Sequence, residues 1–268
     1  MIYLKSPSEI ERMRRAGRLL ASVFMKIAGL IKPGGITADI DAYAEKLIID
    51  AGGEPAFKGY KGGGSRKFPA TLCMSVDNEI VHGIPSKREL KSGQIVGVDA
   101  GVKLDGWYAD MAGSFLIDEV NDQKKKLWNV TREALYRGIK QMRPGNRLSE
   151  IGSAIQNWVE SNGFSVIRDL VGHGIGTNLH EDPAVPNYNF RRGDLTLKEG
   201  MTLAVEPMVS TGSYKIKVLS DGWTAVTVDD SPTAHFEHTI LITDSEPEIL
   251  TLADDDKDPW FEIGINTK

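Results

Sequence analysis

Residues Leu90–Val102 read LKSGQIVGVDAGV, and residues Leu197–Val209 read LKEGMTLAVEPMV. An alignment of these two stretches without a gap places Asp99 on Glu206. Each acid follows an apolar, β-prone run, where a charge is costly unless something compensates it. The doubled strand therefore predicts a site that is built between two related halves of the chain. The residues that match identically are Leu90, Lys91, Gly93, Val98 and Val102.

The segments that precede these two strands are repeated as well. An alignment that places Pro33-Gly34 on Pro144-Gly145 also places Gly52 on Gly163. Pro-Gly pairs end helices, and apolar residues recur at helical spacing on both sides of each pair. Each half is therefore predicted to contain two helices followed by strands.

The boundaries of these helices are marked by capping residues. Ser6-Pro7-Ser8-Glu9 has the pattern of a capping box with Ser6 as the N-cap, so the first helix is predicted to begin there. Pro33-Gly34-Gly35 is predicted to end it, and Thr37 to cap the second helix. Asn121 is predicted to open the third helix, and Gly163 to end the fourth.

The repeat period is far too long for a solenoid, so the expected fold is α/β, of the α+β type. Helices are expected to cover a curved, largely antiparallel sheet. The expected organisation is a single domain, 1–268, with pseudo-symmetric halves at about 1–118 and 119–250. Residues 251–268 are expected to form a loosely attached tail, for which Trp260 and Phe261 are candidate anchors.

Composition excludes several classes of function. The chain has 268 residues, of which 41% are apolar and 26% are charged, as is ordinary for a globular protein. A net charge of −5 argues against an electrostatic nucleic-acid binder, and no apolar run is long enough for a membrane span. The single cysteine, Cys73, excludes an internal disulfide framework. We expect a cytoplasmic protein that binds neither nucleic acid nor membrane.

An Asp-Gly pair lies between two apolar runs in the first half, which predicts a β-hairpin. With Asp105-Gly106 at the two turn positions, Asp110 lies opposite Gly101, two residues from Asp99. Because side chains alternate along a strand, both carboxylates then point to the same face, with backbones within roughly 7–8 Å. A turn with an odd number of residues would break this arrangement.

The second half contributes two further acids in β-prone runs. Glu206 precedes Pro207, and Glu237 lies in Ala234–Thr243 (AHFEHTILIT). If the halves pack about a pseudo-twofold axis, these acids converge on Asp99 and Asp110. Four carboxylates are balanced by two divalent cations, and oxygen ligands with an imidazole suit Mn²⁺, Fe²⁺, Co²⁺ or Zn²⁺.

The histidines fit such a centre. His173 lies between glycines in VGHGIGTNLHEDP, and His180 follows seven residues later. His82 begins HGIP in the first half, which echoes HGIG at His173. His235 and His238 flank Glu237, and strand alternation puts both on the face opposite that acid, so we interpret them as structural.

Other chemistries have weaker support. The chain has no G-x-S-x-G nucleophile elbow. Cys73 is a candidate thiol nucleophile, but no histidine or acid is locally placed to activate it, so a small pocket-lining residue is the favoured interpretation. Lys61–Lys67 (KGGGSRK) is predicted to be a flexible surface loop, since it lacks the ending of a phosphate-binding loop.

These residues together resemble the active site of the methionine aminopeptidases. The matching motifs are SPSEIERMRRAG, SVDNEIVHGIP, VDAGVKLDGWYAD, GHGIGTNLHEDP, LAVEPM and DGWTAVTVDDSPTAHFEHT. They cover nearly the whole chain and keep the order of the family. The resemblance implies the pseudo-symmetric "pita-bread" fold. The short path from His180 to Glu206 resembles the type I, bacterial-like enzymes.

The resemblance also implies a role for each residue. Two divalent metal ions would be held by Asp99, Asp110, His173, Glu206 and Glu237. By the same likeness, Asp110 and Glu237 would bridge the metals and Glu206 would carry a proton from the attacking water to the leaving amine. His180 would stabilise the developing oxyanion, and His82 would contact the scissile amide.

The implied methionine pocket consists of Tyr60, Phe68, Cys73, Leu179 and Trp223. Two features depart from the family pattern. Leu179 replaces a frequent aromatic residue, and KGGGSRK is inserted between Tyr60 and Phe68. Asp77-Asn78 also departs from the usual Asn-Glu, at a loop where some relatives bind a monovalent cation, and the resemblance is not extended to such an ion here. The implied partners are the N-termini of nascent polypeptides, with a transient ribosome contact, and the implied state is a monomer.

Two rival functions stay open at this point. An Xaa-Pro aminopeptidase or dipeptidase would use the same ligands, but those enzymes usually carry a substantial further N-terminal domain, and only a short lead is expected here. A non-enzymatic binding protein on the same fold would have lost metal ligands, and all of them are present.

Overall fold

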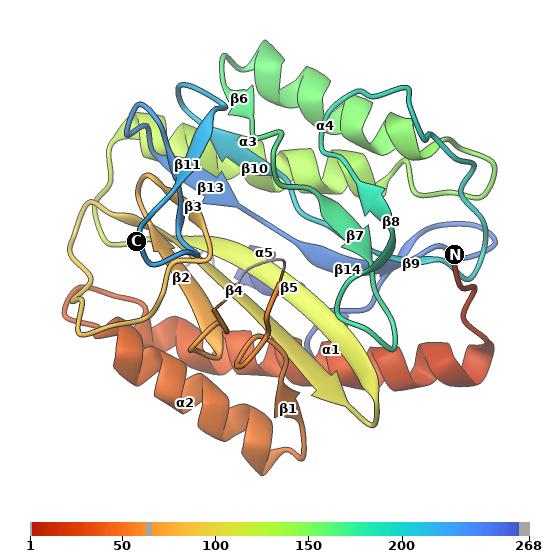
Figure 1. Cartoon of the computed structure of the whole chain (residues 1–268), viewed down its shortest axis with the longest axis horizontal. Coiled ribbons are helices and arrows are strands. Elements are labelled where there is room, and N and C mark those ends of the chain that lie inside the picture. The colour runs from red at the N-terminus through yellow and green to blue at the C-terminus, as the bar shows by residue number, and fades with distance from the viewer. Residues whose placement is uncertain (1, 63–65, 263–268) are drawn as a thin grey trace.

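The structure, a computed structural model, describes residues 2–62 and 66–262 of the chain. The long helices flank the strands: α1 and α2 lie along one side of the molecule and α3 and α4 along the opposite side (Figure 1). The helices are α1 Pro7–Ile27, α2 Thr37–Asp50, α3 Asp122–Ile139, α4 Leu148–Ser161 and the short α5 Pro259–Glu262, with 3-10 turns at Ala28–Leu30 and Asp254–Asp256.

The ladders between the strands are antiparallel throughout the described ranges. One sheet has the order β1 Glu54–Pro55, β4 Ile95–Leu104 and β2 Leu72–Val76, with β5 Trp107–Leu116 also paired to β4. Another has the order β15 Glu248–Ile249, β14 His238–Leu241, β9 Thr202–Val205, β7 Gly172–Gly174 and β8 Glu181–Val185. A third sheet has the order β13 Thr233–His235, β10 Met208–Ser210 and β6 Ser165–Val166. A fourth has the order β11 Ile216–Val218, β12 Ala225–Thr227 and β3 Glu79–Val81. Helices packed on antiparallel sheets confirm the expected fold class.

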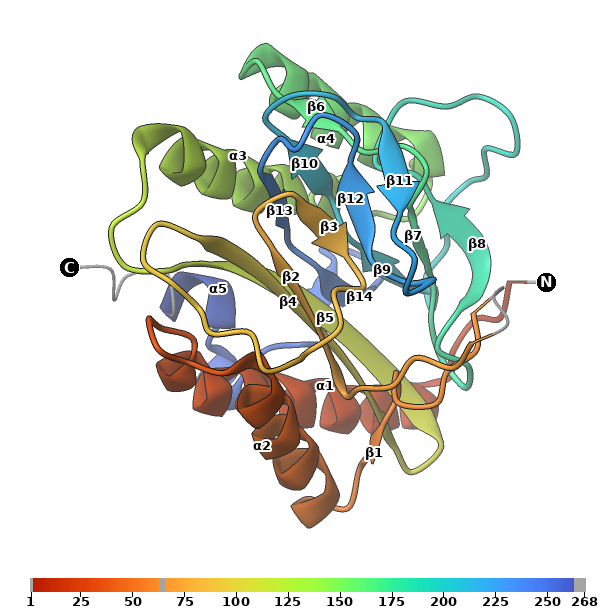
Figure 2. The same ribbon diagram turned by 60° about the vertical axis from the view of Figure 1, so that its left-hand side comes forward.

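The strand pattern decides which face of each sheet meets the helices. Val98, Ala100 and Val102 of β4 are fully buried in the main apolar core. Helix α1 packs against β4 and β5, and α3 packs against β10 and β13 (Figure 2). Because side chains alternate, the residues between the apolar ones point away from the helices, toward the space where the site is built.

The repeated Pro-Gly turns form equivalent backbone bonds in both halves. The Gly34 N–H donates to the Leu90 carbonyl at 2.9 Å, and the Gly145 N–H donates to the Leu197 carbonyl at 3.0 Å. Both glycines have a positive φ, 87° and 92°, which glycine adopts without strain. Each turn is thus tied to the first residue of the doubled strand.

Most of the predicted helix boundaries are confirmed. Ser6 is the N-cap of α1, and the Glu9 carboxylate accepts from the Ser6 N–H at 2.8 Å. Asn121 caps α3 through a bond from the Lys124 N–H at 2.9 Å. The prediction for Thr37 is wrong, because Ile36 is the N-cap of α2 and the Thr37 hydroxyl donates to the Ser86 carbonyl instead.

The C-terminal segment is attached more firmly than predicted. Trp260 is 2% exposed, and Thr251 is fully buried. The remainder of the expected tail, 263–268, lies outside the described residues. Among the residues that the structure describes, no helix is both long and apolar enough to cross a membrane.

Candidate metal centre and substrate pocket

A cavity of about 280 Å³ lies between the sheets. Every site residue predicted from the sequence lines it, and Phe57 and Gly62, which were not predicted, line it as well. The predicted residues that the structure brings together there are Tyr60, Phe68, Cys73, His82, Asp99, Asp110, His173, Leu179, His180, Glu206, Trp223 and Glu237. Residues from both halves of the chain therefore share one cavity.

The β4–β5 hairpin places the first two acids as its turn sequence predicts. Asp105 and Gly106 form the two-residue turn, with φ values of 49° and 84°. A hairpin turn with positive φ at both central residues matches the twist of the strands, and Asp-Gly suits it. Gly101 pairs with Asp110, so Asp99 and Asp110 point to the same face, into the cavity. The predicted parity of the turn is confirmed.

The acids of the second half lie where strands break. Glu206 follows the end of β9, and the Asn187 side chain donates to its carbonyl at 3.0 Å. Glu237 lies between β13 and β14, and its N–H donates to the Ala112 carbonyl of β5 at 2.8 Å. This single bridge brings Glu237 next to the strand that carries Asp110.

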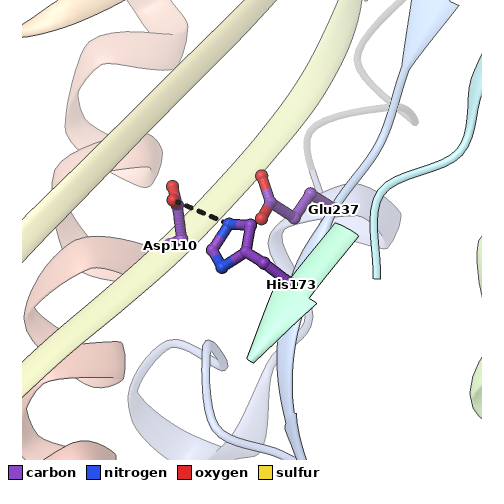
Figure 3. Close-up of side chains that lie close together, drawn as sticks. All are labelled: Asp110, His173 and Glu237. Atoms are coloured by element: carbon purple, nitrogen blue, oxygen red, sulfur yellow. Dashed lines mark ion pairs between the residues drawn. The ribbon is translucent and has the colours of Figure 1, made fainter. Parts of the chain in front are cut away.

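Three side chains meet closely enough to hold a common ion. Asp110, His173 and Glu237 each offer one ligand atom, and these atoms lie within 4.8 Å of one another (Figure 3). The His173 Nε2 lies 3.8 Å from Asp110 Oδ2 and 3.8 Å from Glu206 Oε1. The His173 Nδ1 bonds to the Gly174 carbonyl at 2.8 Å, so Nδ1 carries the proton and the Nε2 lone pair faces the carboxylates.

Two carboxylates of this cluster lack a partner among the residues that the structure describes. Asp99 Oδ1 and Glu237 Oε1 are buried without a hydrogen-bond partner among the described residues. The described residues that line the cavity include no lysine or arginine. Buried carboxylates without partners are costly, and divalent cations are the groups that compensate them. The site therefore fits metal ions, as the sequence predicts.

The electrostatics of the carboxylates point the same way. Burial, then the Asp110 and Glu206 charges, raises the pKa of Asp99 well above its ordinary value. Burial, then the charges of the neighbouring acids, raises the pKa of Glu237 well above its ordinary value. Burial, then the Asp110 charge, also raises the pKa of Glu206 well above its ordinary value. Burial raises the pKa of Asp110 to about 7. Bound cations would reverse these shifts, because they favour the ionised form.

Two further histidines stand beside the carboxylates. His180 lies next to His173, with ring centroids 4.2 Å apart, and its Nδ1 bonds to the Tyr60 hydroxyl at 2.7 Å. The rings of His82 and Trp223 pack in a T-shaped arrangement, with centroids 6.1 Å apart. Burial and then His180 lower the pKa of His82 to about 4, and burial lowers the pKa of His180. Both rings are therefore neutral hydrogen-bonding groups near pH 7.

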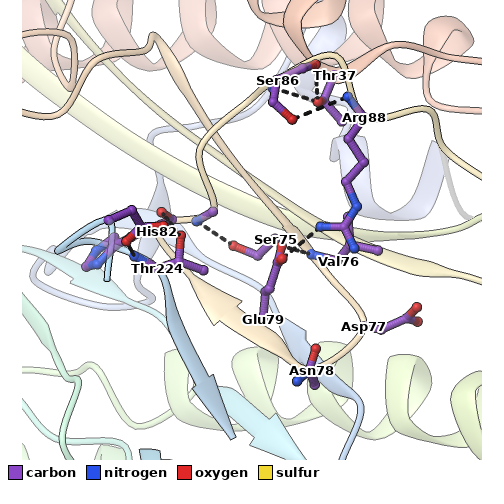
Figure 4. Close-up of polar contacts among 12 residues, drawn as sticks. Thr37, Ser75, Val76, Asp77, Asn78, Glu79, His82, Ser86, Arg88 and Thr224 are labelled. Carbon is purple, nitrogen blue, oxygen red and sulfur yellow. Dashed lines mark hydrogen bonds and ion pairs between the residues drawn. The ribbon is translucent and has the colours of Figure 1, made fainter. Parts of the chain in front are cut away.

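His82 is held in an unusual backbone conformation, with φ of 60°. The Thr224 hydroxyl donates to the His82 carbonyl at 3.4 Å, and the following Gly83 N–H donates to the Ser75 hydroxyl at 3.1 Å (Figure 4). A side chain at Gly83 would clash with the Met74 carbonyl, 2.3 Å from its Cβ. The glycine after His82 therefore allows the turn that aims the ring into the cavity.

An apolar wall completes the cavity. The ring of Phe68 packs edge-on against Trp223 at 5.2 Å. The Phe68 N–H donates to the Tyr60 carbonyl at 2.8 Å, which holds Phe68 beside Tyr60 in the pocket. Of the predicted flexible loop Lys61–Lys67, residues 63–65 lie outside the described ranges. Burial, then Asp99, raises the pKa of Cys73 well above its ordinary value, which disfavours a thiolate nucleophile.

Besides Phe57 and Gly62, sequence reasoning missed the contact of His235 with the site. His235 was expected to face away from Glu237 as a structural residue, but its Nε2 lies 3.7 Å from Glu206 Oε2. His238 does point elsewhere, with its Nδ1 2.7 Å from the Thr251 hydroxyl. Strict alternation fails here because β13 ends at His235 and β14 begins at His238. No local pattern signals this break, since it depends on the long-range contact of Glu237.

Comparison with known proteins agrees with this geometry. Residues 11–244 match the model of metallopeptidase family M24. The chain belongs to metallopeptidase family M24. It is 47% identical to methionine aminopeptidase 1 of Bacillus subtilis, over 94% of this chain and 99% of the relative.

Solved structures of this family share the fold. Methionine aminopeptidase from Thermotoga maritima has a TM-score of 0.89 and 47% identity, covering 94% of this chain and 99% of that chain. Methionine aminopeptidase from Rickettsia prowazekii has a TM-score of 0.90 and 40% identity, and the match covers 94% of this chain and 100% of that chain. The predicted resemblance and the pita-bread fold are confirmed.

A more distant solved structure has the same fold in a longer chain. Prolidase from Pyrococcus furiosus has a TM-score of 0.72 and 21% identity, and the match covers 92% of this chain and 65% of that chain. At this level of identity the likeness concerns the fold alone.

Proposed function

We propose that this chain is a metal-dependent aminopeptidase that hydrolyses the peptide bond after an N-terminal methionine. The observation that carries the proposal is the meeting of buried, unpartnered carboxylates with an apolar pocket in one cavity. Relatives with nearly full-length similarity are methionine aminopeptidases, which supports this function over the Xaa-Pro alternative.

The metal centre is proposed to use the ligand set of both halves. Asp110 and Glu237 would be shared between two divalent ions, Asp99 would complete one ion, and His173 with Glu206 would complete the other. Ligands of this kind accept Mn²⁺, Fe²⁺, Co²⁺ or Zn²⁺. When bound, such ions polarise the scissile carbonyl and lower the pKa of a water molecule.

The surrounding side chains are proposed to carry the protons and the charge. Glu206 would take a proton from the attacking water and pass it to the leaving amine, a role that suits a carboxylate lining the cavity beside the proposed metal centre. His180, held by Tyr60, would donate a hydrogen bond to the carbonyl oxygen as charge develops there. His82 would contact the scissile amide.

The apolar wall is proposed to bind the methionine side chain. Its residues are Tyr60, Phe68, Cys73, Leu179 and Trp223. A thioether is soft and flexible, and it packs well against aromatic and aliphatic walls. Because the wall lies beside the carboxylates, the N-terminal residue would be bound with its amino group close to them, which explains action on chain ends.

The wider setting is also a proposal. The equivalent bonds at Gly34 and Gly145 support one catalytic domain with halves at about 1–118 and 119–250, followed by residues 251–268. Action as a monomer is part of the same proposal. Substrates with a new N-terminal methionine are nascent polypeptides, so the proposed place of action is the cytoplasm, with transient contact with the ribosome.

The test is hydrolysis by metal-free protein titrated in turn with Mn²⁺, Fe²⁺, Co²⁺ and Zn²⁺. Met-Ala-Ser and an Xaa-Pro tripeptide are compared under each condition. We expect turnover to require a divalent ion and to release methionine from Met-Ala-Ser. Preference for the Xaa-Pro peptide would establish the rival function, and turnover without any metal would overturn the mechanism.

A further inference from the structure

The segment after Leu250 lies beyond residues 11–244, the range that the family model matches. It is nevertheless packed into the protein. The Trp260 ring packs edge-on against Phe24 of α1 at 5.2 Å and against Phe236 at 5.9 Å. A Cβ at Gly113 would lie 2.4 Å from the Trp260 ring, so the backbone of β5 leaves space for the indole. Trp260 thus occupies a fitted position behind the site.

The same indole contacts a residue of the proposed metal centre. The Trp260 Nε1–H donates to the backbone carbonyl of Glu237 at 3.3 Å. On its other side, the Glu237 N–H donates to the Ala112 carbonyl at 2.8 Å. Glu237 lies in the gap between β13 and β14, outside any named strand. Its backbone is therefore held by one bond from β5 and one from the C-terminal segment.

A second contact of this segment leads to Asp110. The Thr239 N–H donates to the Thr251 hydroxyl at 3.3 Å. The Thr239 hydroxyl donates to the Asp110 carbonyl at 2.8 Å and accepts from the Asp110 N–H at 3.0 Å. Thr251 also bonds to His238 Nδ1 at 2.7 Å. The strand that follows Glu237 is thus tied to Thr251 on one side and to Asp110 on the other.

The segment has its own anchor on α3. The Tyr136 hydroxyl donates to Asp258 Oδ2 at 2.5 Å, and the Trp260 N–H donates to Asp258 Oδ1 at 2.9 Å. The Arg132 side chain donates to the Trp260 carbonyl at 3.3 Å. These bonds fix the backbone on both sides of the indole, so the indole is presented to Glu237 by a rigid support.

We propose that residues 251–262 form a clamp that positions Glu237 and Asp110 for metal binding, with Trp260 as the positioning residue. This inference rests on the proposed metal centre. Ligands shared by two ions must hold their geometry closely, and outer contacts that orient ligands typically change metal affinity 10–100-fold when they are removed. The clamp connects α1, α3 and the gap between β13 and β14; it bonds to Glu237 directly and reaches Asp110 through Thr239.

The test compares two tryptophan-to-phenylalanine variants of the full chain. Trp260→Phe keeps an aromatic ring and removes the N–H that bonds to Glu237. Trp128→Phe is the matched control, because Trp128 also packs on Phe236, with ring centroids 5.4 Å apart, but donates its N–H to the carbonyl of Ser114, which is not one of the proposed ligands. Binding of Mn²⁺ to the metal-free proteins is measured by calorimetry, and the visible spectrum of the Co²⁺ forms reports ligand geometry.

We expect Trp260→Phe to weaken Mn²⁺ binding by about tenfold and to change the Co²⁺ spectrum, with Trp128→Phe within about twofold of the parent. Equal affinity and spectra for Trp260→Phe and the parent would overturn the clamp. Equal weakening in both variants would also overturn it, since a general loss of packing would then explain the effect.

A second pair of variants covers the case in which Trp260→Phe does not fold. Thr251→Val removes the hydroxyl that bonds to Thr239 and His238, and Thr251→Ser restores it. Weaker Mn²⁺ binding in the valine variant with recovery in the serine variant supports the clamp, and no difference between them contradicts it. If the parent binds Mn²⁺ but does not release methionine, the proposed function fails while the clamp is still tested. A parent that binds no divalent ion overturns both.

Discussion

The two halves of the chain present equivalent acids on different kinds of backbone. In the first half, Asp99 and Asp110 lie on one uninterrupted hairpin, paired from Ile95–Leu116 to Leu104–Trp107. In the second half, Glu206 and Glu237 lie at interruptions between short strands. The hairpin positions its acids through local geometry, whereas the second half depends on contacts from distant residues. The predictions below test how much each arrangement contributes.

The largest effect is expected from removing an acid of the hairpin. Asp110→Asn takes away the carboxylate that lies near both His173 and Glu237, so metal affinity and turnover should fall by more than about 100-fold, beyond the loss typical of outer contacts. Mn²⁺ calorimetry and Met-Ala-Ser hydrolysis measure the two quantities.

Asp105→Asn is the control in the same hairpin. Asn-Gly suits the same turn as Asp-Gly, so this variant should keep metal affinity and turnover within about twofold. An active Asp110→Asn variant, or an inactive Asp105→Asn variant, would show that the acids of the hairpin do not act as described.

In the second half, Glu206→Gln should leave a folded protein with turnover reduced by at least about 100-fold, the scale of general acid–base catalysis. The amide keeps the shape of the side chain but cannot take a proton. Steady-state kinetics at saturating metal separate this effect from weaker metal binding. Turnover equal to that of the parent would remove Glu206 from proton transfer.

Metal affinity should depend on pH because protons compete for the same carboxylates. Burial raises the pKa of Asp110 to about 7 in the absence of metal, so this group is protonated below that pH and must lose its proton when an ion binds. Mn²⁺ affinity should therefore fall about tenfold per pH unit for each proton displaced as the pH drops below about 7. Calorimetry between pH 8 and pH 6 in roughly unit steps tests the sign, and an affinity that rises toward acid pH would contradict it.

The smallest effect is expected at His235. His235→Leu removes the imidazole whose Nε2 lies 3.7 Å from Glu206 Oε2 and should lower turnover by up to about tenfold. His235→Gln restores a donor and should recover most of the loss. Burial, then His82, lowers the pKa of His235 to about 3, so the ring acts as a neutral group and its removal should not shift the pH profile of kcat.

The contrast between the halves also explains what could be predicted from the sequence. The Asp-Gly turn encodes the parity of the hairpin, so the common face of Asp99 and Asp110 follows from local chemistry. The face that His235 presents depends on the bridge between Glu237 and Ala112, which joins residues far apart in the chain. Periodicity holds no information about such a contact.

The C-terminal segment gives a second example. An acidic stretch near a chain end predicts weak attachment, yet Trp260, a candidate anchor in the sequence, is buried. The space for that ring is provided by Gly113, which has no side chain to fill it. Which glycine leaves room for which distant residue is decided by tertiary packing, so sequence reasoning identified the candidate anchor but not its neighbours.

The most direct test of the central claim is a crystal structure of the Mn²⁺-loaded protein with anomalous diffraction to locate the ions. We expect two ions about 3.5–4 Å apart, with Asp110 and Glu237 in contact with both. Asp99 should contact one ion, and His173 and Glu206 the other. Ions held by residues of only one half, or no ion in this cavity, would contradict the claim that the two halves build one metal centre.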